Sequence, residues 1–321
     1  MPAFSIIVPS YNRAHCLTET LSSLDSQTYR DFEVIIVDDG SIDSTQDLVS
    51  DFIKDKPNFK MIHNGLNLGE SESINIGWKS AKGQYVAIVS SDDPQEISWL
   101  DLMISAISAN RGFVIYYPNL RVIDESNRIL ASYSQKVWNN RNLYGHLLCI
   151  ASAGSIINRS ILAKEFLPRD NSIDFPSDLI QMLELGLIGS GFRVESCFGT
   201  WRDHKESLTS KTNPQFRATK FQKNVFLWIE RNYVKNGLEK WLPLAFTYLL
   251  LQSWDMLRAL KFGKNKVMIF LRLPYTKSLL LMPSVTGRLI IQISYLLTKK
   301  SWRFFTQNFT IIRGHFSQID V

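Results

Sequence analysis

A short apolar run that ends in two adjacent carboxylates constrains this sequence more than any other feature. The run from Val86 to Val89 has the length and composition of a strand that is buried on both faces. Two serines follow, then Asp92 and Asp93, and Pro94 prevents the strand from continuing. Ligands bind beyond the carboxyl ends of strands in open α/β sheets. The sequence therefore predicts a binding site at this strand end.

Two interpretations of the acidic pair follow from its chemistry. Adjacent carboxylates repel each other, so a bound cation favours the pair, and oxygen ligands suit Mg²⁺ or Mn²⁺. Alternatively, Asp93 caps a helix that starts near Gln95, because Asp is a favoured N-cap residue. The pair taken alone does not decide between a metal site and a helix cap.

The first 130 residues alternate apolar runs with amphipathic stretches, which predicts a mainly parallel sheet covered by helices on both faces. Strands are expected at Phe4–Val8, Val34–Val37, Lys60–His63, Val86–Val89 and Val114–Tyr117. Helices are expected at Ala14–Gln27, Ser44–Lys54, Glu70–Ala81 and Ile97–Ala109. Further along, we expect a helix at Asp178–Gly186, a strand at Phe192–Cys197 and a helical region after Lys211. The fold class is therefore α/β with an α-helical C-terminal region.

The charge of the chain is divided unevenly between its two parts. Residues 1–210 hold 18 basic and 26 acidic residues, a net charge of −8, whereas residues 211–321 hold 18 and 4, a net charge of +14. This asymmetry predicts a separate basic module with a surface that meets an anionic partner. The segment Ser278–Leu297 is strongly apolar, but Pro283 and Arg288 interrupt it. We interpret it as an amphipathic or buried helix rather than a membrane span.

Composition excludes several other classes of protein. With 45% hydrophobic and 21% charged residues, the chain is an ordinary globular protein rather than a disordered one. The three cysteines are far apart and form no CxxC pair, which predicts a reducing compartment and no structural zinc. The N-terminus runs directly into the apolar segment Phe4–Val8, so we expect no secretory signal.

Polar groups also follow the first two expected strands. Tyr11 offers an aromatic face to a base, and Asp39 can accept a hydrogen bond from a nucleobase N–H or a ribose hydroxyl. Gly40 permits a tight turn that lets the backbone approach a ligand. The alternative is two ordinary strand-to-helix turns with capping acids.

These motifs resemble, in order and spacing, the family-2 glycosyltransferases, which are nucleotide-sugar enzymes of the A-type glycosyltransferase fold. The resemblance is specific over residues 4–100 and continues more weakly to about residue 210. The matching text comprises Ser5–Arg13, Val34–Ser41, Asn67–Gly69, Asn75–Gly77, Lys82–Val86 and Ser91–Asp93. It implies a catalytic domain at 1–210, with a nucleotide-sugar half at 1–110 and an acceptor half at 111–210, followed by the basic helical region 211–321.

The resemblance also implies roles for individual residues of the donor site. Pro9, Tyr11 and Asp39 stand where such enzymes hold the nucleobase, while Asp38 in the same turn shapes it. Asp92 stands where the ribose is contacted and Asp93 where the divalent metal is bound, Mn²⁺ or Mg²⁺. Two positions depart from the family pattern: Ser90 replaces the first Asp of the acidic motif, and Ile74 replaces a basic residue that contacts the diphosphate.

In the acceptor half, the resemblance implies a general base and a closing motif. Asp178, in the segment Phe175–Leu183, matches the family's catalytic base; the alternative is a helix N-terminal charge that interacts with the dipole. Asp174 is the second candidate for the base. In the segment Trp201–Thr209, His204 matches a residue that reaches the diphosphate or the metal, and Arg202 adds positive charge.

The resemblance implies an inverting, metal-dependent transferase that moves a sugar from a nucleoside-diphosphate sugar to a hydroxyl acceptor. We expect the donor to be a UDP-sugar and the acceptor to be a glycan or a lipid-linked molecule of cell-envelope polysaccharide synthesis. We expect a cytoplasmic location at the inner face of the plasma membrane and no nucleic-acid partner. The basic tail either binds the anionic membrane surface or packs as a helical domain or homodimer contact. One alternative function is a non-catalytic, membrane-associated nucleotide-sugar-binding protein. Another is a sugar-phosphate nucleotidyltransferase, but Pro9–Arg13 lacks the Gly-rich loop that it needs.

Overall fold

The computed structural model describes residues 1–147, 153–173, 175–204 and 213–258, with four single residues beyond them, Leu279, Met282, Ser284 and Val285. The chain divides into two compact units. Unit 1 comprises residues 1–139 and 149–202, and unit 2 comprises residues 140–148 and 203–321. Asp174, residues 205–209 of the closing motif and most of the expected helix at 278–297 lie outside the described residues.

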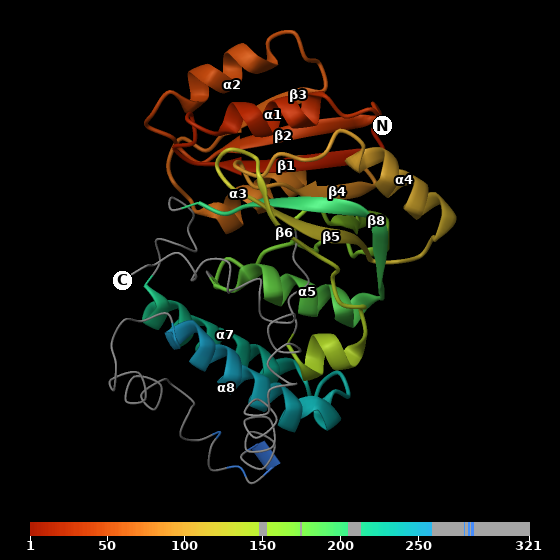
Figure 1. The fold of residues 1–321 in the computed structure, drawn as a ribbon, viewed down its shortest axis with the longest axis vertical. Helices are drawn as coiled ribbons and strands as arrows, with labels where there is room; N and C mark the ends of the chain where they lie inside the picture. Colours follow the sequence, from red (N-terminus) through yellow and green to blue (C-terminus); the bar gives the residue numbers. More distant parts are fainter. Residues whose placement is uncertain are drawn as a thin grey trace. The chain divides into compact units, whose positions relative to one another are not determined.

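Unit 1 is built on one mixed sheet, which has eight strands in the described part of the chain (Figure 1). The strands are β1 (Phe4–Ser10), β2 (Phe32–Asp38), β3 (Phe59–His63), β4 (Tyr85–Ile88), β5 (Ile115–Ile123), β6 (Ile129–Tyr133), β7 (Ile156–Asn158) and β8 (Gly191–Arg202). Their order is β3-β2-β1-β4-β7-β5-β6, with β8 paired to β5. The strands β3, β2, β1 and β4 run parallel, whereas β7 is antiparallel to both β4 and β5.

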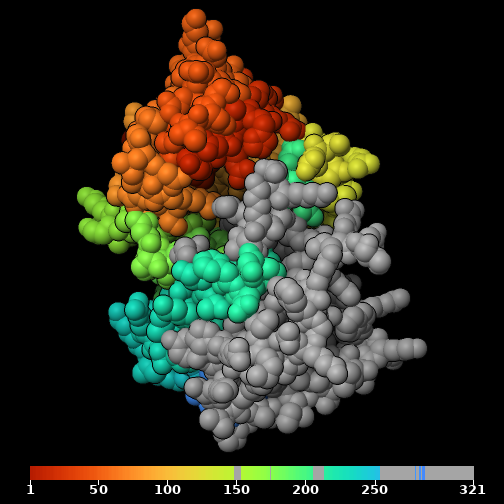
Figure 2. Space-filling view, turned by 90° about the vertical axis from the view of Figure 1, so that its left-hand side faces the viewer, coloured from red at the N-terminus to blue at the C-terminus, as the bar shows by residue number. Residues whose placement is uncertain are grey.

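Helices cover both faces of the parallel strands, as the apolar runs predict. The helices of unit 1 are α1 (Leu17–Asp25), α2 (Thr45–Ile53), α3 (Glu70–Ser80), α4 (Trp99–Ala109) and α5 (Ser177–Ile188), with a 3₁₀ turn, η2 (Arg159–Ile161). All seven residues of β1 are buried, and its side chains alternate between the two faces. Ile6 belongs to the core that α1, α2 and α4 form, while Ile7 lies against Gly77 of α3. In the space-filling view, the N-terminal residues pack into one continuous body (Figure 2).

The structure confirms the expected α/β class and adds two strands that the sequence pattern does not predict. The side chains of β6 are mostly exposed and β7 has only three residues, so neither forms a long buried apolar run. Strand β8 also extends beyond the expected Phe192–Cys197, because it pairs with the whole length of β5. At α1 the expected start at Ala14 is wrong: the helix begins at Leu17, after a loop that is hydrogen-bonded to the neighbouring turn.

Unit 2 is mainly helical where the structure describes it, which agrees with the expectation for residues 213–258. It contains α7 (Pro214–Asn232), α8 (Leu242–Arg258), a 3₁₀ turn η3 (Glu239–Trp241) and a π-helix η1 (Arg141–Gly145). The rings of Tyr144 and Tyr233 pack edge to face, 6.3 Å apart, and the Tyr233 hydroxyl donates to the Tyr144 carbonyl. Within the residues described, no helix combines the length and apolar character that crossing a membrane requires.

Candidate active site

The loops that follow β1 and β2 are joined to each other by hydrogen bonds. The Asn12 N–H donates to the Ser41 hydroxyl (2.9 Å), and the Asn12 side-chain oxygen accepts from the Ile42 N–H (2.9 Å). The Arg13 N–H donates to the Thr45 hydroxyl (2.9 Å). Asn12 has a φ of 55°, a conformation that Asn tolerates better than most residues. The two predicted nucleotide-contacting turns therefore form one structural unit.

Pro9 and Tyr11 lie on either side of the end of β1. Pro9 is buried and pairs with Val37 of β2. Tyr11 is 41% exposed. An aromatic face that reaches solvent beside a carboxylate turn can stack against a nucleobase.

The adjacent residues Asp38 and Asp39 have different partners. Asp38 is fully buried, and its Oδ2 lies 2.8 Å from Nδ1 of His63. Asp39 is 3% exposed; its Oδ1 accepts from the Asn64 amide (3.0 Å) and the Leu68 N–H (2.8 Å), and its Oδ2 accepts from the Gly69 N–H (2.9 Å). Asp38 thus binds the end of β3, and Asp39 holds the loop that leads into α3.

Gly40 is required at this turn by both conformation and space. Its φ is 73°, in the left-handed region that favours glycine. A Cβ atom at this position would lie 2.6 Å from the backbone carbon of Leu66. The loop 64–69 therefore packs directly on the backbone of the Asp39 turn.

The acidic pair lies beyond the end of β4, and the helix-cap interpretation of Asp93 is wrong. Helix α4 begins at Trp99 with Ser98 at the N-cap position. Asp93 is 5% exposed and Asp92 is half-buried. Burial raises the pKa of Asp93 well above its usual value and the charge of Asp92 raises it further, while hydrogen bonds from the Arg202 N–H and the Ser90 hydroxyl lower it. The site therefore concentrates negative charge in a poorly solvated place, which favours a cation.

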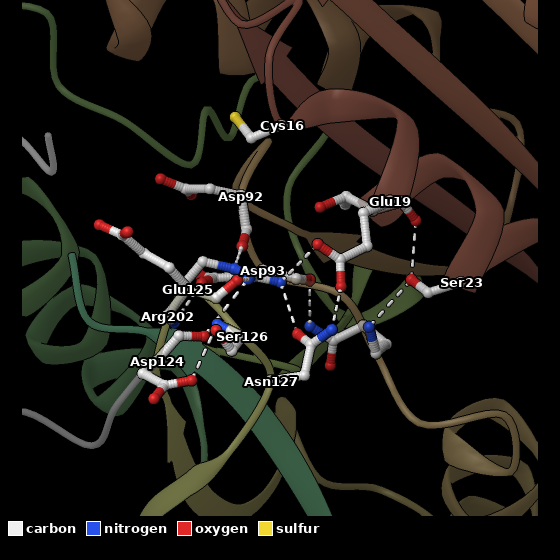
Figure 3. Close-up of polar contacts among 12 residues, drawn as sticks. Cys16, Glu19, Ser23, Asp92, Asp93, Asp124, Glu125, Ser126, Asn127 and Arg202 are labelled. Atoms are coloured by element: carbon white, nitrogen blue, oxygen red, sulfur yellow. Dashed lines mark hydrogen bonds and ion pairs between the residues drawn. The ribbon is translucent and has the colours of Figure 1, made fainter.

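Arg202, the last residue of β8, is directed at this acidic turn (Figure 3). Its N–H donates to Oδ1 of Asp93 (2.7 Å), and its Nε donates to the Asp92 carbonyl (2.9 Å). The two terminal nitrogens donate to Glu19, Asn127 and two main-chain carbonyls of the β5–β6 turn. The Arg202 side chain, which the sequence predicts to add positive charge, thus donates its hydrogen bonds to protein acceptors.

Asp178 is the second residue of α5 and is half-buried. Buried amide and guanidinium groups connect α5 with α3: the Asn75 amide donates to the Arg169 carbonyl (2.9 Å), the Arg169 N–H donates back to the Asn75 side-chain oxygen (3.1 Å), and the Arg169 guanidinium donates to Gln181. Asn75, from the Asn75–Gly77 motif, therefore holds the segment around Arg169, which leads to the predicted base Asp178.

Glu70, which the sequence interpretation missed, lies within the electrostatic reach of both acidic groups. Part of its side chain is exposed. Burial nevertheless raises its pKa, with Arg169 opposing and the carboxylates of Asp178 and Asp92 adding to the rise. The charges of Asp92 and Asp178 thus both act on Glu70, at the start of α3. The only signal in the sequence was the position of Glu70 directly after the Asn67–Gly69 motif.

The next question is which side chains could hold the predicted metal ion. Among the residues that the structure describes, no three His, Cys, Asp or Glu side chains form a group suited to a metal ion. His204 is buried and belongs to unit 2, two residues after Arg202. Asp92 and Asp93 nevertheless fit a divalent ion that takes its other ligands from substrate phosphates and water.

Parallel strands whose ends carry an exposed aromatic ring, a carboxylate turn and a second acidic pair define the class as an A-type glycosyltransferase fold. The family model "Glycosyl transferase family 2" matches residues 5–166. The chain belongs to this family, which confirms the resemblance seen in the motifs.

Two curated relatives illustrate the range of similarity. An uncharacterised glycosyltransferase of Haemophilus influenzae is 29% identical over 182 residues, which cover 55% of this chain and 56% of the relative. The UDP-Glc:alpha-D-GlcNAc-diphosphoundecaprenol beta-1,3-glucosyltransferase WfgD of Escherichia coli is 27% identical over 257 residues, 77% of this chain and 90% of that protein. The chain spans about half, or less, of the length of the first curated relatives that it matches.

Two solved structures share the fold. TarS 1–349 of S. aureus in complex with UDP-GlcNAc superimposes with a TM-score of 0.59 at 19% identity, covering 90% of this chain and 89% of that one. The mannosyltransferase PcManGT of Pyrobaculum calidifontis in complex with GDP-Man and Mn²⁺ gives a TM-score of 0.56 at 16% identity, covering 97% and 85%.

Proposed function

We propose that this protein is an inverting glycosyltransferase that moves a sugar from a nucleoside-diphosphate donor to a hydroxyl group of a glycan or lipid-linked acceptor in cell-envelope glycan synthesis. The observation that carries the proposal is the buried Asp93 beside Asp92, at the end of a strand that adjoins the Tyr11–Asp39 turns. The name of WfgD, a relative over most of this chain, specifies a UDP-sugar donor and a diphosphoundecaprenol-linked acceptor. We assign the same general classes, a nucleoside-diphosphate sugar and a glycan or lipid-linked acceptor, to this chain.

Pro9, Tyr11 and Asp39 are assigned to the nucleobase and Asp92 to the ribose. Asp39 accepts three hydrogen bonds from the loop 64–69, whereas a carboxylate has about four acceptor positions. One position is therefore open to an N–H group of a base. The exposed ring of Tyr11 supplies the stacking face, and the half-buried carboxylate of Asp92 accepts from a ribose hydroxyl.

Mn²⁺ or Mg²⁺ is assigned to Asp93, with His204 as a further ligand of the metal or the diphosphate. The ion supplies neutralisation of the charge that develops on the departing nucleoside diphosphate. The carboxylate of Asp93 is buried beside a second carboxylate, which is the charge arrangement that a divalent cation compensates. PcManGT, which shares the fold, binds Mn²⁺ together with its donor.

Asp178 is assigned the role of general base. In a single displacement, the acceptor hydroxyl attacks the anomeric carbon and a carboxylate takes its proton. The charge of Asp178 acts on the same neighbour, Glu70, as the charge of Asp92. This shared effect on the pKa of Glu70 supports the assignment.

A donor screen tests the proposal directly. Thermal shift and turnover are measured with UDP-sugars and GDP-sugars, with Mn²⁺ and after EDTA treatment. We expect one donor class to stabilise the protein in a Mn²⁺-dependent manner and to be consumed. Binding of every donor without consumption, in the presence of acceptor lipid, would favour the non-catalytic alternative.

We also propose that residues 211–321 attach the enzyme to the anionic inner face of the plasma membrane, with packing or a homodimer contact as the alternative. In the described part, Phe216 of α7 is 51% exposed, and the Lys220 ammonium lies 5.4 Å from its ring centre. Exposed aromatic groups beside cations suit a membrane interface, where each basic residue contributes about 1 kcal/mol. Co-sedimentation with anionic vesicles at low salt, lost on truncation after residue 210, would support attachment. Protein that stays in the supernatant would contradict it.

A further inference from the structure

Arg202 makes more contacts with the acidic turn than a residue that only adds charge would need. It is 6% exposed. Its N–H group donates to Oδ1 of Asp93 at 2.7 Å, and its Nε donates to the Asp92 carbonyl at 2.9 Å. Backbone and side chain of one residue therefore hold the Asp92–Asp93 dipeptide at two points, as Figure 3 shows.

The rest of the guanidinium binds two further segments of the chain. One terminal nitrogen donates to the carbonyls of Asp124 (3.3 Å) and Glu125 (3.1 Å) in the β5–β6 turn. The other donates to the Asn127 side-chain oxygen (2.8 Å) and to Glu19 of α1 (2.8 Å). The guanidinium thus joins α1, the acidic turn and the β5–β6 turn at one place.

These contacts decide what Arg202 can do. Each N–H group of its guanidinium already has a protein acceptor, so none is left for a direct hydrogen bond to the diphosphate. Three of the acceptors are main-chain carbonyls, so the hydrogen bonds depend on the position of the backbone rather than on a mobile partner side chain. A lysine would keep the charge, but its single nitrogen cannot reproduce the planar set of donors.

We propose that Arg202 is a positioning residue for the donor site. This inference rests on the proposed function. It fixes the backbone of Asp92 and directs Oδ1 of Asp93 to its own N–H, which sets the orientation of the carboxylate that would hold a divalent ion. Glu19 and Asn127 hold the guanidinium in place. Groups that orient metal ligands in this way affect metal affinity by about 10–100-fold when they are removed.

The test compares four variants for Mn²⁺ binding in the presence of UDP or GDP, measured from the electron paramagnetic resonance signal of free Mn²⁺. Arg202→Lys and Arg202→Gln remove the planar donors, and Glu19→Gln weakens their anchor. Arg193→Gln is the matched control: Arg193 lies on the same strand, and its guanidinium donates to the Gln135 carbonyl at 2.6 Å, outside the acidic turn. Melting temperature and near-ultraviolet circular dichroism report folding.

We expect Arg202→Lys and Arg202→Gln to weaken Mn²⁺ binding by about 10–100-fold, Glu19→Gln to weaken it less, and Arg193→Gln to leave it unchanged. A folded Arg202→Lys variant with wild-type affinity would overturn the inference. If neither Arg202 variant folds, the Glu19→Gln variant is the test. Wild-type Mn²⁺ affinity in that variant would overturn the inference about Arg202. Wild-type protein that binds no Mn²⁺ with either nucleotide would overturn the proposed function itself and the positioning role with it.

Discussion

The two strands that flank β1 each end in a pair of aspartates, but the two pairs are treated in opposite ways. After β2, Asp39 accepts three hydrogen bonds from the loop 64–69, and Asp38 lies 2.8 Å from the His63 ring nitrogen. After β4, Asp93 accepts from one N–H group of Arg202 and from the Ser90 hydroxyl, while its neighbour adds a repelling charge. In the first pair, Asp39 accepts three protein hydrogen bonds, although Oδ1 of Asp38 has no hydrogen-bond partner among the described residues. In the second pair, burial and the charge of Asp92 raise the pKa of Asp93.

We propose that this difference lets the same dipeptide serve two purposes. Donors from the protein turn the first pair into a scaffold: it fixes the loop 64–69 and leaves one carboxylate position for a base. The second pair is held by the backbone and side chain of Arg202, which set its direction without cancelling its charge. A buried acidic pair of this kind is stabilised by a divalent ion, so we assign metal binding to the second turn and base recognition to the first.

The largest expected effect comes from removing the charge of the second turn. Asp93→Asn keeps an oxygen that can accept from the Arg202 N–H, so the fold should persist, while the loss of the metal ligand should abolish turnover. Asp38→Asn makes the same chemical change in the first turn and should lower stability but keep turnover per folded molecule. Donor consumption and the melting temperature of both variants check this. Near-native turnover of Asp93→Asn would contradict the assignment of metal binding to the second turn.

A large effect is also expected at Asp178, whose charge, like that of Asp92, raises the pKa of Glu70. Asp178→Asn should preserve donor binding and lower kcat by about 10²–10⁴-fold, the range for loss of a general base. Single-turnover kinetics with the donor separate binding from chemistry. NMR of the product determines the anomeric configuration, and a retained configuration would contradict the single displacement.

The sequence reveals the two acidic turns because each depends on local features: an apolar run, then polar residues, then Pro94 or Gly40. It does not reveal Arg202 as the residue that holds the second turn, because Arg202 and Glu19 are 183 positions apart and meet only when β8 pairs with β5. A charged residue in a closing motif looks the same in sequence whether it contacts substrate or backbone. The difference lies in which acceptors the fold places around it.

Strand β7 shows a second limit of sequence patterns. Its three residues insert between β4 and β5 and make the sheet mixed, yet such a short run cannot be told from a loop. The contacts from Asn75 to Arg169 are also invisible in sequence, since 94 positions separate the two residues. Local strand ends were therefore predictable, whereas the antiparallel half and the long-range polar contacts were not.

A moderate effect on stability is expected when the first turn loses its acceptor. Asp39→Ala leaves the N–H groups of Leu68 and Gly69 without their carboxylate partner. Hydrogen bonds to a charged group contribute about 1.5–3 kcal/mol, so we expect a loss of that order in the free energy of unfolding. Urea denaturation measures it, and Asp51→Ala at an exposed position of α2 is the control. Unchanged stability would mean that the carboxylate does not hold the loop.

The smallest expected effect is a pH dependence of stability that Glu70 causes. Glu70 lies in the chain between the two turns. Gly69, directly before it, donates to Asp39, whereas the charge of Asp92 acts on Glu70 itself. Burial and the neighbouring carboxylates raise the pKa of Glu70 in the folded protein above the value of an unfolded chain. Its contribution to stability is therefore fully present below the unfolded pKa, about 4.3, and is lost as the pH rises through the raised folded pKa. The Glu70→Gln variant cannot ionise at this position, so its melting temperature relative to the wild type should increase between pH 4 and pH 8.

This difference in melting temperature should become smaller when Mn²⁺ and UDP are added, because the metal compensates the charge of Asp92. A constant difference across this pH range would show that Glu70 does not sense the second turn.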